Sequence, residues 1–291
     1  MTRPWHRPAG LAGLALSASL AACSNSSSPS TGLGNEQTSA IGGVVRDDAE
    51  DATNALSVTT AVQPYGLTFS GGNGSAACVA GSSTLDSDGD GVPDNTTYDF
   101  TAPPCSFGSF RGGSFSLTGR LIIQDPTPSA AGFGYTATIQ NLIFAYDGPG
   151  TANDYTATGN GNRTLSGTST GLTLSDSATT TRTFSGQLAA TIVKTWSVSF
   201  SPATPLQINQ PLPSGTITID GTLSWTRGSE VFAMTMTTQK ALAYDATCTN
   251  TTQRIKDGEL RAAGTFNGKA GYVRISWSAC GTDPQYQFFG S

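Results

Sequence analysis

The chain has 291 residues and a formal net charge of −5, from 20 acidic and 15 basic side chains. Charged residues make up only 12 % of it, and no stretch concentrates lysine or arginine. This composition argues against nucleic acid as a partner and against charge-driven attachment to anionic lipid.

The first 22 residues are typical of a secretory signal. They carry Arg3 and Arg7 and no acid, and an apolar run that ends in small residues follows. The run is too short to cross a bilayer as a helix, so residues 1–22 are predicted to be a signal peptide that is removed. Its removal takes away Arg3, Arg7 and the single histidine, His6, which changes the formal charge from −5 to −7.

Leu20-Ala21-Ala22-Cys23 stands at the end of this apolar run. The four residues resemble the lipobox of bacterial lipoproteins, in which the cysteine is joined to diacylglycerol, the chain is cut before it and the new amino group is acylated. The resemblance implies lipidation of Cys23. Several acyl chains, each buried methylene contributing about 0.8 kcal/mol, give stable membrane anchoring. Ser24 follows the cysteine where an Asp would favour the inner membrane, which implies the outer membrane, on its periplasmic or cell-surface face.

Residues 23–42 contain few apolar side chains and are predicted to be a flexible tether. A random chain of this length spans about 25 Å. No second linker divides the remainder, so residues 43–291 are predicted to form one β-rich domain.

Within this domain, residues 44–57 have a weakly apolar face and predict one short helix. Most of the rest alternates apolar and polar side chains, the pattern of strands with one buried face. The run from Ile217 to Trp225 is the clearest, and the run from Leu188 to Phe200 is interrupted by Lys194. Similar runs cover residues 115–123, 135–145, 231–238, 260–266 and 272–279. Short, turn-rich gaps between the runs favour an antiparallel meander.

The predicted fold class is therefore all-β. Asn267-Gly268 predicts a two-residue hairpin, because a type I′ turn needs positive φ at both central positions. These runs are longer than the usual five or six residues, and the run from Leu188 to Phe200 has 13, which favours a strongly curved sheet. The long strands can cover their apolar face as a sandwich or as a partly open or closed barrel, and both arrangements remain open.

Four cysteines follow Cys23: Cys78, Cys105, Cys248 and Cys280. An even number in an exported protein predicts two disulfides, out of three possible pairings. Pairing of Cys78 with Cys105 would clamp the ends of an Asp-rich loop, and a meander would bring Cys248 and Cys280 to one end of the sheet.

The segment DSDGDGVPDN carries carboxylates at alternate positions, Asp86, Asp88 and Asp90, followed by Gly91. Ca²⁺ takes six to eight oxygen ligands, and carboxylates at loop positions 1, 3 and 5 can converge while the glycine permits a sharp turn. The segment resembles the calcium loops of EF-hands and of thrombospondin type 3 repeats.

This resemblance implies the Val92 carbonyl as a further ligand and Asp94 as a ligand, directly or through water. The chain departs from the EF-hand pattern at loop position 12, where Thr97 replaces a bidentate Glu, and Asp99 lies two residues later. The expected role of the ion, over residues 86–99, is structural. The missing Glu predicts the affinity of extracellular modules, about 10⁻⁴ to 10⁻³ M.

Histidine-dependent catalysis is not expected, because His6 leaves with the signal. A glycosidase could use two carboxylates, and the candidates are Asp220, Glu230, Asp245 and Glu259. Trp196, Trp225, Trp277 and Tyr272 could stack on sugars or line a lipid cavity, although aromatic residues at alternating strand positions usually belong to a core.

The sequence thus predicts a lipid-anchored, exported, non-catalytic binding or structural module of the bacterial envelope, stabilised by calcium and disulfides. Its ligand would be a glycan, a lipid or an envelope protein. Two alternatives remain open: a carrier of a lipid or acyl chain in a barrel-like cavity, and a glycan-active enzyme on a β-sandwich.

Overall fold

The computed structural model describes residues 33–56, 80–81, 85–101, 105–110, 113–147, 154–184, 189–249, 253–266 and 268–290. The predicted signal peptide, Cys23 and Cys78 lie outside these residues.

All thirteen described strands belong to one antiparallel sheet, so the predicted all-β meander is confirmed. The order follows the chain, β1-β2-β4 and onward to β13, and β3 pairs with β4 beside this path. The strands are β1 (Ala80–Gly81), β2 (Asn95–Asp99), β3 (Cys105–Phe110), β4 (Gly113–Gln124), β5 (Tyr135–Asp147), β6 (Tyr155–Thr168), β7 (Gly171–Phe184), β8 (Ala190–Pro202), β9 (Gly215–Arg227), β10 (Glu230–Tyr244), β11 (Ile255–Phe266), β12 (Lys269–Trp277) and β13 (Gln285–Gly290).

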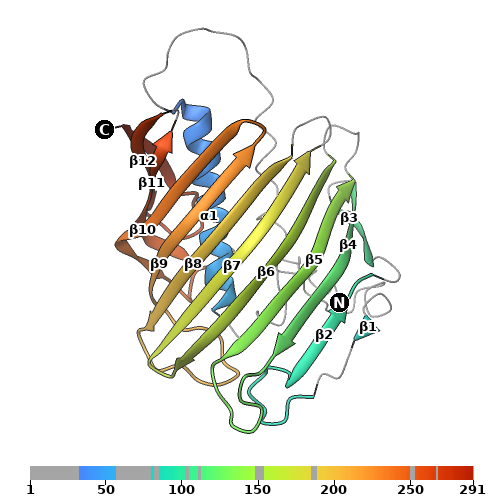
Figure 1. Ribbon diagram of the computed structural model, residues 1–291. Coiled ribbons are helices and arrows are strands. Elements are labelled where there is room, and N and C mark those ends of the chain that lie inside the picture. The colour runs from blue at the N-terminus through green and yellow to red at the C-terminus, as the bar shows by residue number, and fades with distance from the viewer. Residues whose placement is uncertain are drawn as a thin grey trace, which may run out of the picture.

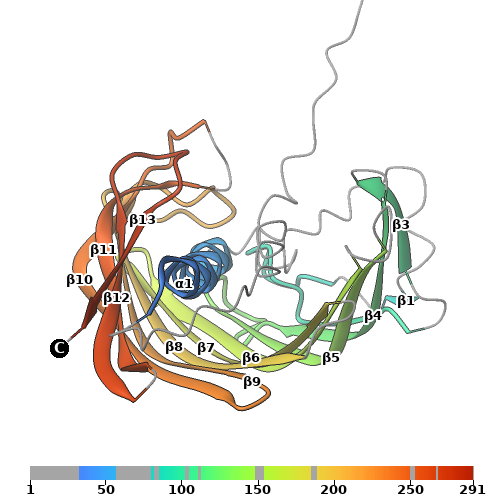
Figure 2. The ribbon, with the colours of Figure 1, turned by 90° about the horizontal axis from the view of Figure 1, so that it is seen from above.

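The sheet curls into an open trough around a single helix, α1 (Asn35–Ala55), as Figures 1 and 2 show. Its two edges do not pair with each other, so the sheet is not closed into a barrel. Of the arrangements that the sequence left open, the described strands thus adopt a strongly curved, open one. The helix covers part of the concave face.

The predicted alternation of side chains is present in the strands. In β8, Ile192, Trp196, Val198 and Phe200 are buried and the residues between them are exposed, apart from Lys194, which also points inward. The predicted hairpin is present as well: Phe266 pairs with Lys269, and Gly268 has a φ of 78°.

The helix is longer than the sequence predicted, because it begins at Asn35 instead of Val44. Residues 35–42, which we assigned to the flexible tether 23–42, are therefore helical. The tether is predicted from the few apolar side chains of residues 23–42, and Gly42 and Gly43 also have low helix propensity. Tertiary packing overrides this propensity, because Gly42 lies against the ring of Tyr286 in β13 and any Cβ at this position would overlap that ring.

Helix α1 is buried on more than one side, which an ordinary surface helix is not. Val45, Ala49 and Ala52 are fully buried among the core residues, while Asp48 and Arg46 are buried polar residues. Burying charged groups is costly unless they are paired, so the charges on α1 need partners on the sheet.

These partners form an ion-pair network on the concave face. Lys194 Nζ lies 3.3 Å from Asp48 Oδ1 and 3.0 Å from Asp176 Oδ2. Arg163 Nη2 lies 2.6 Å from Asp51 Oδ2 and 3.0 Å from Asp176 Oδ2. Asp48 and Asp51 belong to α1, whereas Arg163, Asp176 and Lys194 come from β6, β7 and β8. The network therefore ties the helix to the centre of the sheet.

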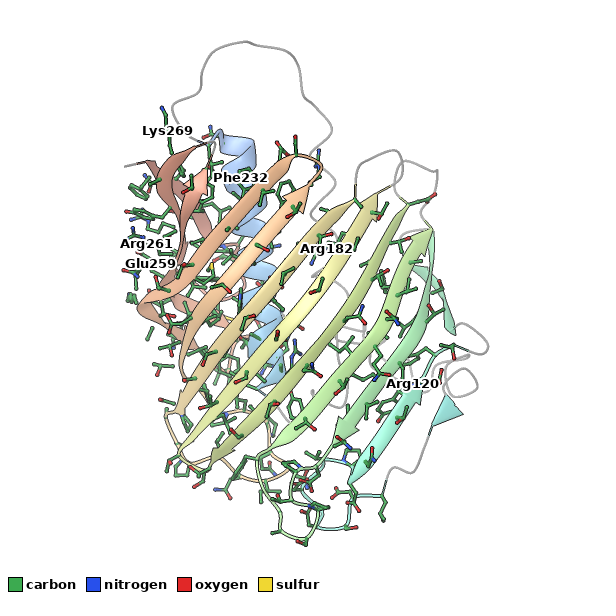
Figure 3. All side chains as sticks on the ribbon, in the orientation of Figure 1. Arg120, Arg182, Phe232, Glu259, Arg261 and Lys269 are labelled. Carbon is green, nitrogen blue, oxygen red and sulfur yellow. A yellow bond between two sulfur atoms is a disulfide. The ribbon has the colours of Figure 1, made fainter. Side chains whose placement is uncertain are left out.

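Three residues of the network have shifted pKa values, and each shift reflects burial acting against the neighbouring charges. Burial opposes ionisation of Asp176, but Arg163 and Lys194 outweigh it and lower its pKa. Burial also opposes the charge on Lys194, but Asp48 and Asp176 outweigh it and raise its pKa. For Asp48 the effect of burial is larger than that of its cationic neighbours, so its pKa is raised. Lys194 and Arg182, which is labelled in Figure 3, lower this pKa but do not cancel the effect of burial.

Two further contacts hold the helix. The Tyr135 hydroxyl donates a hydrogen bond of 2.8 Å to the Ala55 carbonyl, which satisfies one acceptor of the last helical turn. Arg46 Nη1 lies 2.8 Å from Asp283 Oδ1, in the segment between β12 and β13. Both the middle of α1 and its C-terminal end are thus fixed to the sheet.

Cys248 and Cys280 form a disulfide, as one of the predicted pairings requires. It joins the segment after β10 to the segment after β12. Cys105 lies at the start of β3; its predicted partner, Cys78, is among the residues that the structure does not describe.

We expect Asp176→Asn to lower the free energy of unfolding by about 3–5 kcal/mol, because it removes the carboxylate that both Arg163 and Lys194 bind in the interior. Urea denaturation followed by circular dichroism measures this change. As a control, Asp257→Asn removes the carboxylate of an exposed pair with Lys240 and should leave the urea midpoint nearly unchanged. Equal effects of the two substitutions would contradict a clamping role of the network.

Candidate calcium-binding loop

The Asp-rich segment forms a compact loop directly before β2, at one end of the trough. Two other connections contact it. The Gly132 N–H, between β4 and β5, donates to Asp90 Oδ2 at 3.0 Å, and the Asn209 side chain, between β8 and β9, donates to the Gly89 carbonyl. The loop therefore lies where three parts of the chain meet.

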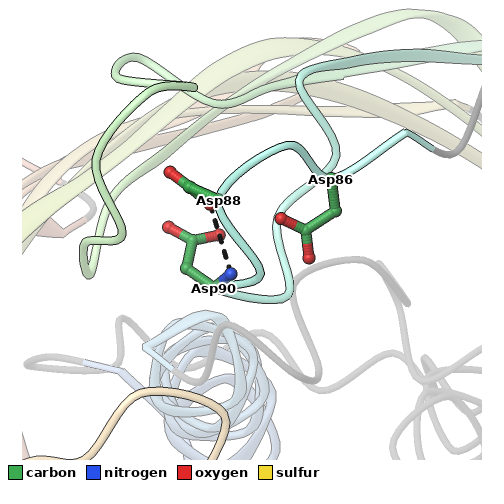
Figure 4. A group of neighbouring side chains, drawn as sticks. All are labelled: Asp86, Asp88 and Asp90. Carbon is green, nitrogen blue, oxygen red and sulfur yellow. Dashed lines mark hydrogen bonds between the residues drawn. The ribbon is translucent and has the colours of Figure 1, made fainter.

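Three carboxylates converge in this loop, as the sequence predicted. One oxygen from each of Asp86, Asp88 and Asp90 lies within 4.8 Å of the others (Figure 4). Gly91 has a φ of 91°, in the region that favours glycine, which allows the sharp turn after Asp90. These three residues could hold a metal ion.

Backbone donors set the orientation of the carboxylates. Asp86 accepts hydrogen bonds from the N–H groups of Gly89 at 2.8 Å and Gly91 at 2.9 Å. Asp90 Oδ1 accepts from the Val92 N–H at 2.8 Å. Asp88 accepts a longer bond, 3.2 Å, from the Asp90 N–H. Val92 is fully buried, so the loop is anchored in the core directly after its last converging carboxylate.

Asp94, an expected ligand, does not join the converging carboxylates. Its two oxygens accept hydrogen bonds from Ser87, at 2.8 Å from the backbone N–H and 2.6 Å from the hydroxyl. These bonds close the loop on itself and lower the pKa of Asp94. In this arrangement Asp94 therefore closes the loop by accepting hydrogen bonds from Ser87, and we call this contact the clasp.

Asp99 is also occupied elsewhere. It accepts hydrogen bonds from Thr101 and from Arg120 of β4, which hold its pKa at about 2. Thr97 lies in β2. Neither residue belongs to the converging group, so the loop sequence itself supplies three carboxylates.

Sequence reasoning missed a fourth acid beside the loop, Asp125, which directly follows β4. Its backbone N–H donates to the carbonyls of Pro93 and Asp94, and its Oδ1 accepts from the Thr127 N–H at 2.8 Å. Burial raises its pKa, and the charges of Asp90, Asp88 and Asp94 raise it further, against the effect of the Thr127 N–H. The only sequence signal was an acid at the end of a strand, 31 positions after Asp94.

The carboxylates considered for glycoside hydrolysis are dispersed. Glu230 and Asp245 lie at opposite ends of the 15-residue β10, with Asp245 just beyond its last residue. Asp220 is exposed on β9 and accepts a hydrogen bond from the Thr238 N–H. Glu259, labelled in Figure 3, lies on β11 and pairs in register with Lys240 of β10. A glycosidase needs two carboxylates about 5–10 Å apart, and these positions do not single out such a pair.

The aromatic residues mostly belong to the core. Trp196 and Trp277 are buried, and Trp225 stacks on Phe232 with ring centroids 5.4 Å apart. Tyr272 stacks on Phe289 and carries the guanidinium of Arg261 3.9 Å above its ring.

One surface depression of about 430 Å³ lies where the β9–β10 hairpin meets the β11–β12 hairpin. It is lined by Ser229, Glu230, Val231, Phe232, Ala233, Thr265 and Gly268, and so contains a single carboxylate.

Comparison with protein families, with characterised proteins and with solved structures found no match for this chain. Among the described residues, no helix has the length and apolar character needed to cross a membrane.

The clasp between Ser87 and Asp94 predicts a pH effect. Because the folded-state pKa of Asp94 is lowered, its charge stabilises the loop above the usual carboxyl pKa, and this stabilisation is lost as the pH falls through the folded-state value. We expect Ser87→Ala to raise the pKa of Asp94 toward its usual value, measured by carboxyl ¹³C titration of the metal-free protein. Asp245, whose pKa is held at about 2 by Thr247 and Lys256, is the internal control and should not move.

Proposed function

We propose that this chain is a lipid-anchored, exported, non-catalytic module of the bacterial envelope whose β domain is stapled by a calcium ion. The observation that carries the calcium assignment is the convergence of Asp86, Asp88 and Asp90 within 4.8 Å. Carboxylates this close repel one another, and a divalent cation between them turns this repulsion into attraction.

The position of the loop supports a structural role for the ion. The loop contacts the β4–β5 connection through Gly132 and the β8–β9 connection through Asn209. An ion that rigidifies the loop therefore stabilises one whole end of the trough. Because Val92 anchors the loop in the core, metal binding is coupled to folding.

Export and anchoring rest on the N-terminal segment, with the lipobox-like Leu20–Cys23 as the attachment point. The Cys248–Cys280 disulfide is consistent with an oxidising compartment. Free calcium at millimolar concentration outside the cytosol would fill a site of the expected affinity.

We favour a structural or binding module over a lipid carrier because of what lies on the concave face. A carrier of acyl chains needs an apolar cavity. In the described part of the chain, α1 and the buried charges of Arg163, Asp176 and Lys194 occupy the centre of this face. An acyl chain in this position would have to displace paired charges.

Calcium should raise the melting temperature of the processed protein. At 10 mM Ca²⁺, an affinity of about 10⁻⁴ to 10⁻³ M corresponds to about 1.4–2.7 kcal/mol of stabilisation, or several degrees. Asp88→Asn should abolish most of this shift. Asp220→Asn, which removes the same charge from β9, should retain the shift. If Ca²⁺ does not change the melting temperature of the wild-type protein, the proposed stabilisation by calcium is wrong.

Expression of the full chain in a bacterium with lipoprotein processing should yield a membrane-bound product. Intact mass spectrometry should show cleavage before Cys23 and the added mass of acyl chains. The Cys23→Ser variant should lack these chains and become extractable without detergent. Recovery of the wild type as an unmodified chain would contradict the lipoprotein assignment.

A further inference from the structure

The fourth acid, Asp125, is more deeply buried than a surface carboxylate should be. Only 7 % of the residue is exposed. One carboxylate oxygen, Oδ1, accepts the Thr127 N–H, but the other, Oδ2, is buried and has no hydrogen-bond partner among the described residues. A buried carboxylate oxygen without a donor is strongly unfavourable, so such an atom calls for an explanation.

The surroundings of Asp125 make its burial still less favourable in the absence of a cation. Its backbone is hydrogen-bonded to residues 93 and 94, beside the acidic loop, and the charges of Asp90, Asp88 and Asp94 act on its carboxylate. Asp88 resembles Asp125 in this respect, because its Oδ2 atom is also buried without a hydrogen-bond partner among the described residues. Asp90 is only 1 % exposed. Both oxygens of Asp86 and of Asp90 accept backbone N–H groups, so among these acids only Oδ2 of Asp88 and Oδ2 of Asp125 lack a donor in the described part of the chain.

We propose that Asp125 is a ligand of the calcium ion, supplied by the β4–β5 connection in place of the missing acid at loop position 12. This inference rests on the calcium site proposed above. The ion would bind the carboxylates of Asp86, Asp88 and Asp90, which converge within 4.8 Å, and Asp125 Oδ2 would approach it from outside this group.

The residues closer in sequence are unsuited to this role. Asp94 is held by Ser87, Asp99 by Arg120 and Thr101, and Thr97 has no carboxylate. The backbone of Asp125, by contrast, is fixed against the loop by its own N–H. Since the affinity of a calcium site depends on the number of charged ligands, a fourth carboxylate compensates for the absent Glu.

A ligand from the β4–β5 connection changes what the ion does in the fold. With Asp86, Asp88 and Asp90 alone, the ion orders one loop. With Asp125 it joins that loop directly to the end of β4, so the ion cross-links two segments of the sheet.

The test is calorimetric titration of the processed full-length protein with CaCl₂, for the wild type and for Asp125→Asn. Asn keeps the size of the side chain and can still accept the Thr127 N–H. We expect binding to weaken about tenfold or more, because one charged ligand is lost. Asp245→Asn is the matched control: Asp245 also follows a strand and accepts the N–H of a threonine two residues on, and its substitution should leave calcium affinity unchanged.

Melting temperatures separate a ligand from a structural residue. A ligand predicts that Asp125→Asn leaves the metal-free protein as stable as the wild type or more stable, and reduces the shift caused by Ca²⁺. A structural residue predicts the same loss with and without Ca²⁺. In the wild type itself, which avoids any folding defect of the variant, Ca²⁺ should shift the carboxyl ¹³C resonance of Asp125.

The outcomes distinguish the two proposals. If the wild type does not bind Ca²⁺, the proposed function is overturned and the inference with it. If the wild type binds and Asp125→Asn binds equally well, or the Asp125 resonance does not move, only the inference is overturned and the calcium loop stands.

Discussion

The ion pairs between α1 and the concave face are the interaction on which the rest of the structure depends. An open sheet of thirteen strands exposes a large inner surface unless something covers it. The helix provides this cover, and Asp48 and Asp51 fix it by pairing with Lys194 and Arg163. Hydrophobic burial is non-directional, whereas each ion pair requires one particular partner. We therefore expect the charges to favour one placement of α1 in the trough, in addition to whatever they contribute to stability.

Two kinds of cross-link join connections at the same end of the strands. The acidic loop contacts the connections between β4 and β5 and between β8 and β9. The Cys248–Cys280 disulfide joins the segments that follow β10 and β12. A sheet with free edges lacks the mutual restraint that closure gives a barrel, and cross-links between its connections supply a substitute.

Much of this fold could be predicted from the sequence, because side-chain alternation is a local signal. The all-β meander, the hairpin at Gly268 and the three converging carboxylates follow from patterns within ten or so residues. The interruption of β8 by Lys194 was a signal too, since an inward-facing lysine requires a buried acid. What could not be predicted depends on distant partners. The helical residues before Val44 include Gly42, which packs on Tyr286 of the distant β13, and Asp125 approaches the acidic loop only through the pairing of β4 with β2.

The sequence separation of the helix from its partners has a consequence for how the chain reaches its final state. Asp51 bonds to Arg163, 112 positions later in the chain, and Asp48 bonds to Lys194, 146 positions later. Contacts between such distant residues carry a large loop-closure entropy and slow the search for the native topology. Helix α1 precedes β6, β7 and β8 in the chain, so it is synthesised before them. Asp48 and Asp51 stay hydrated until Lys194 and Arg163 are in place. We therefore expect α1 to dock on the sheet late in folding, although it is made early.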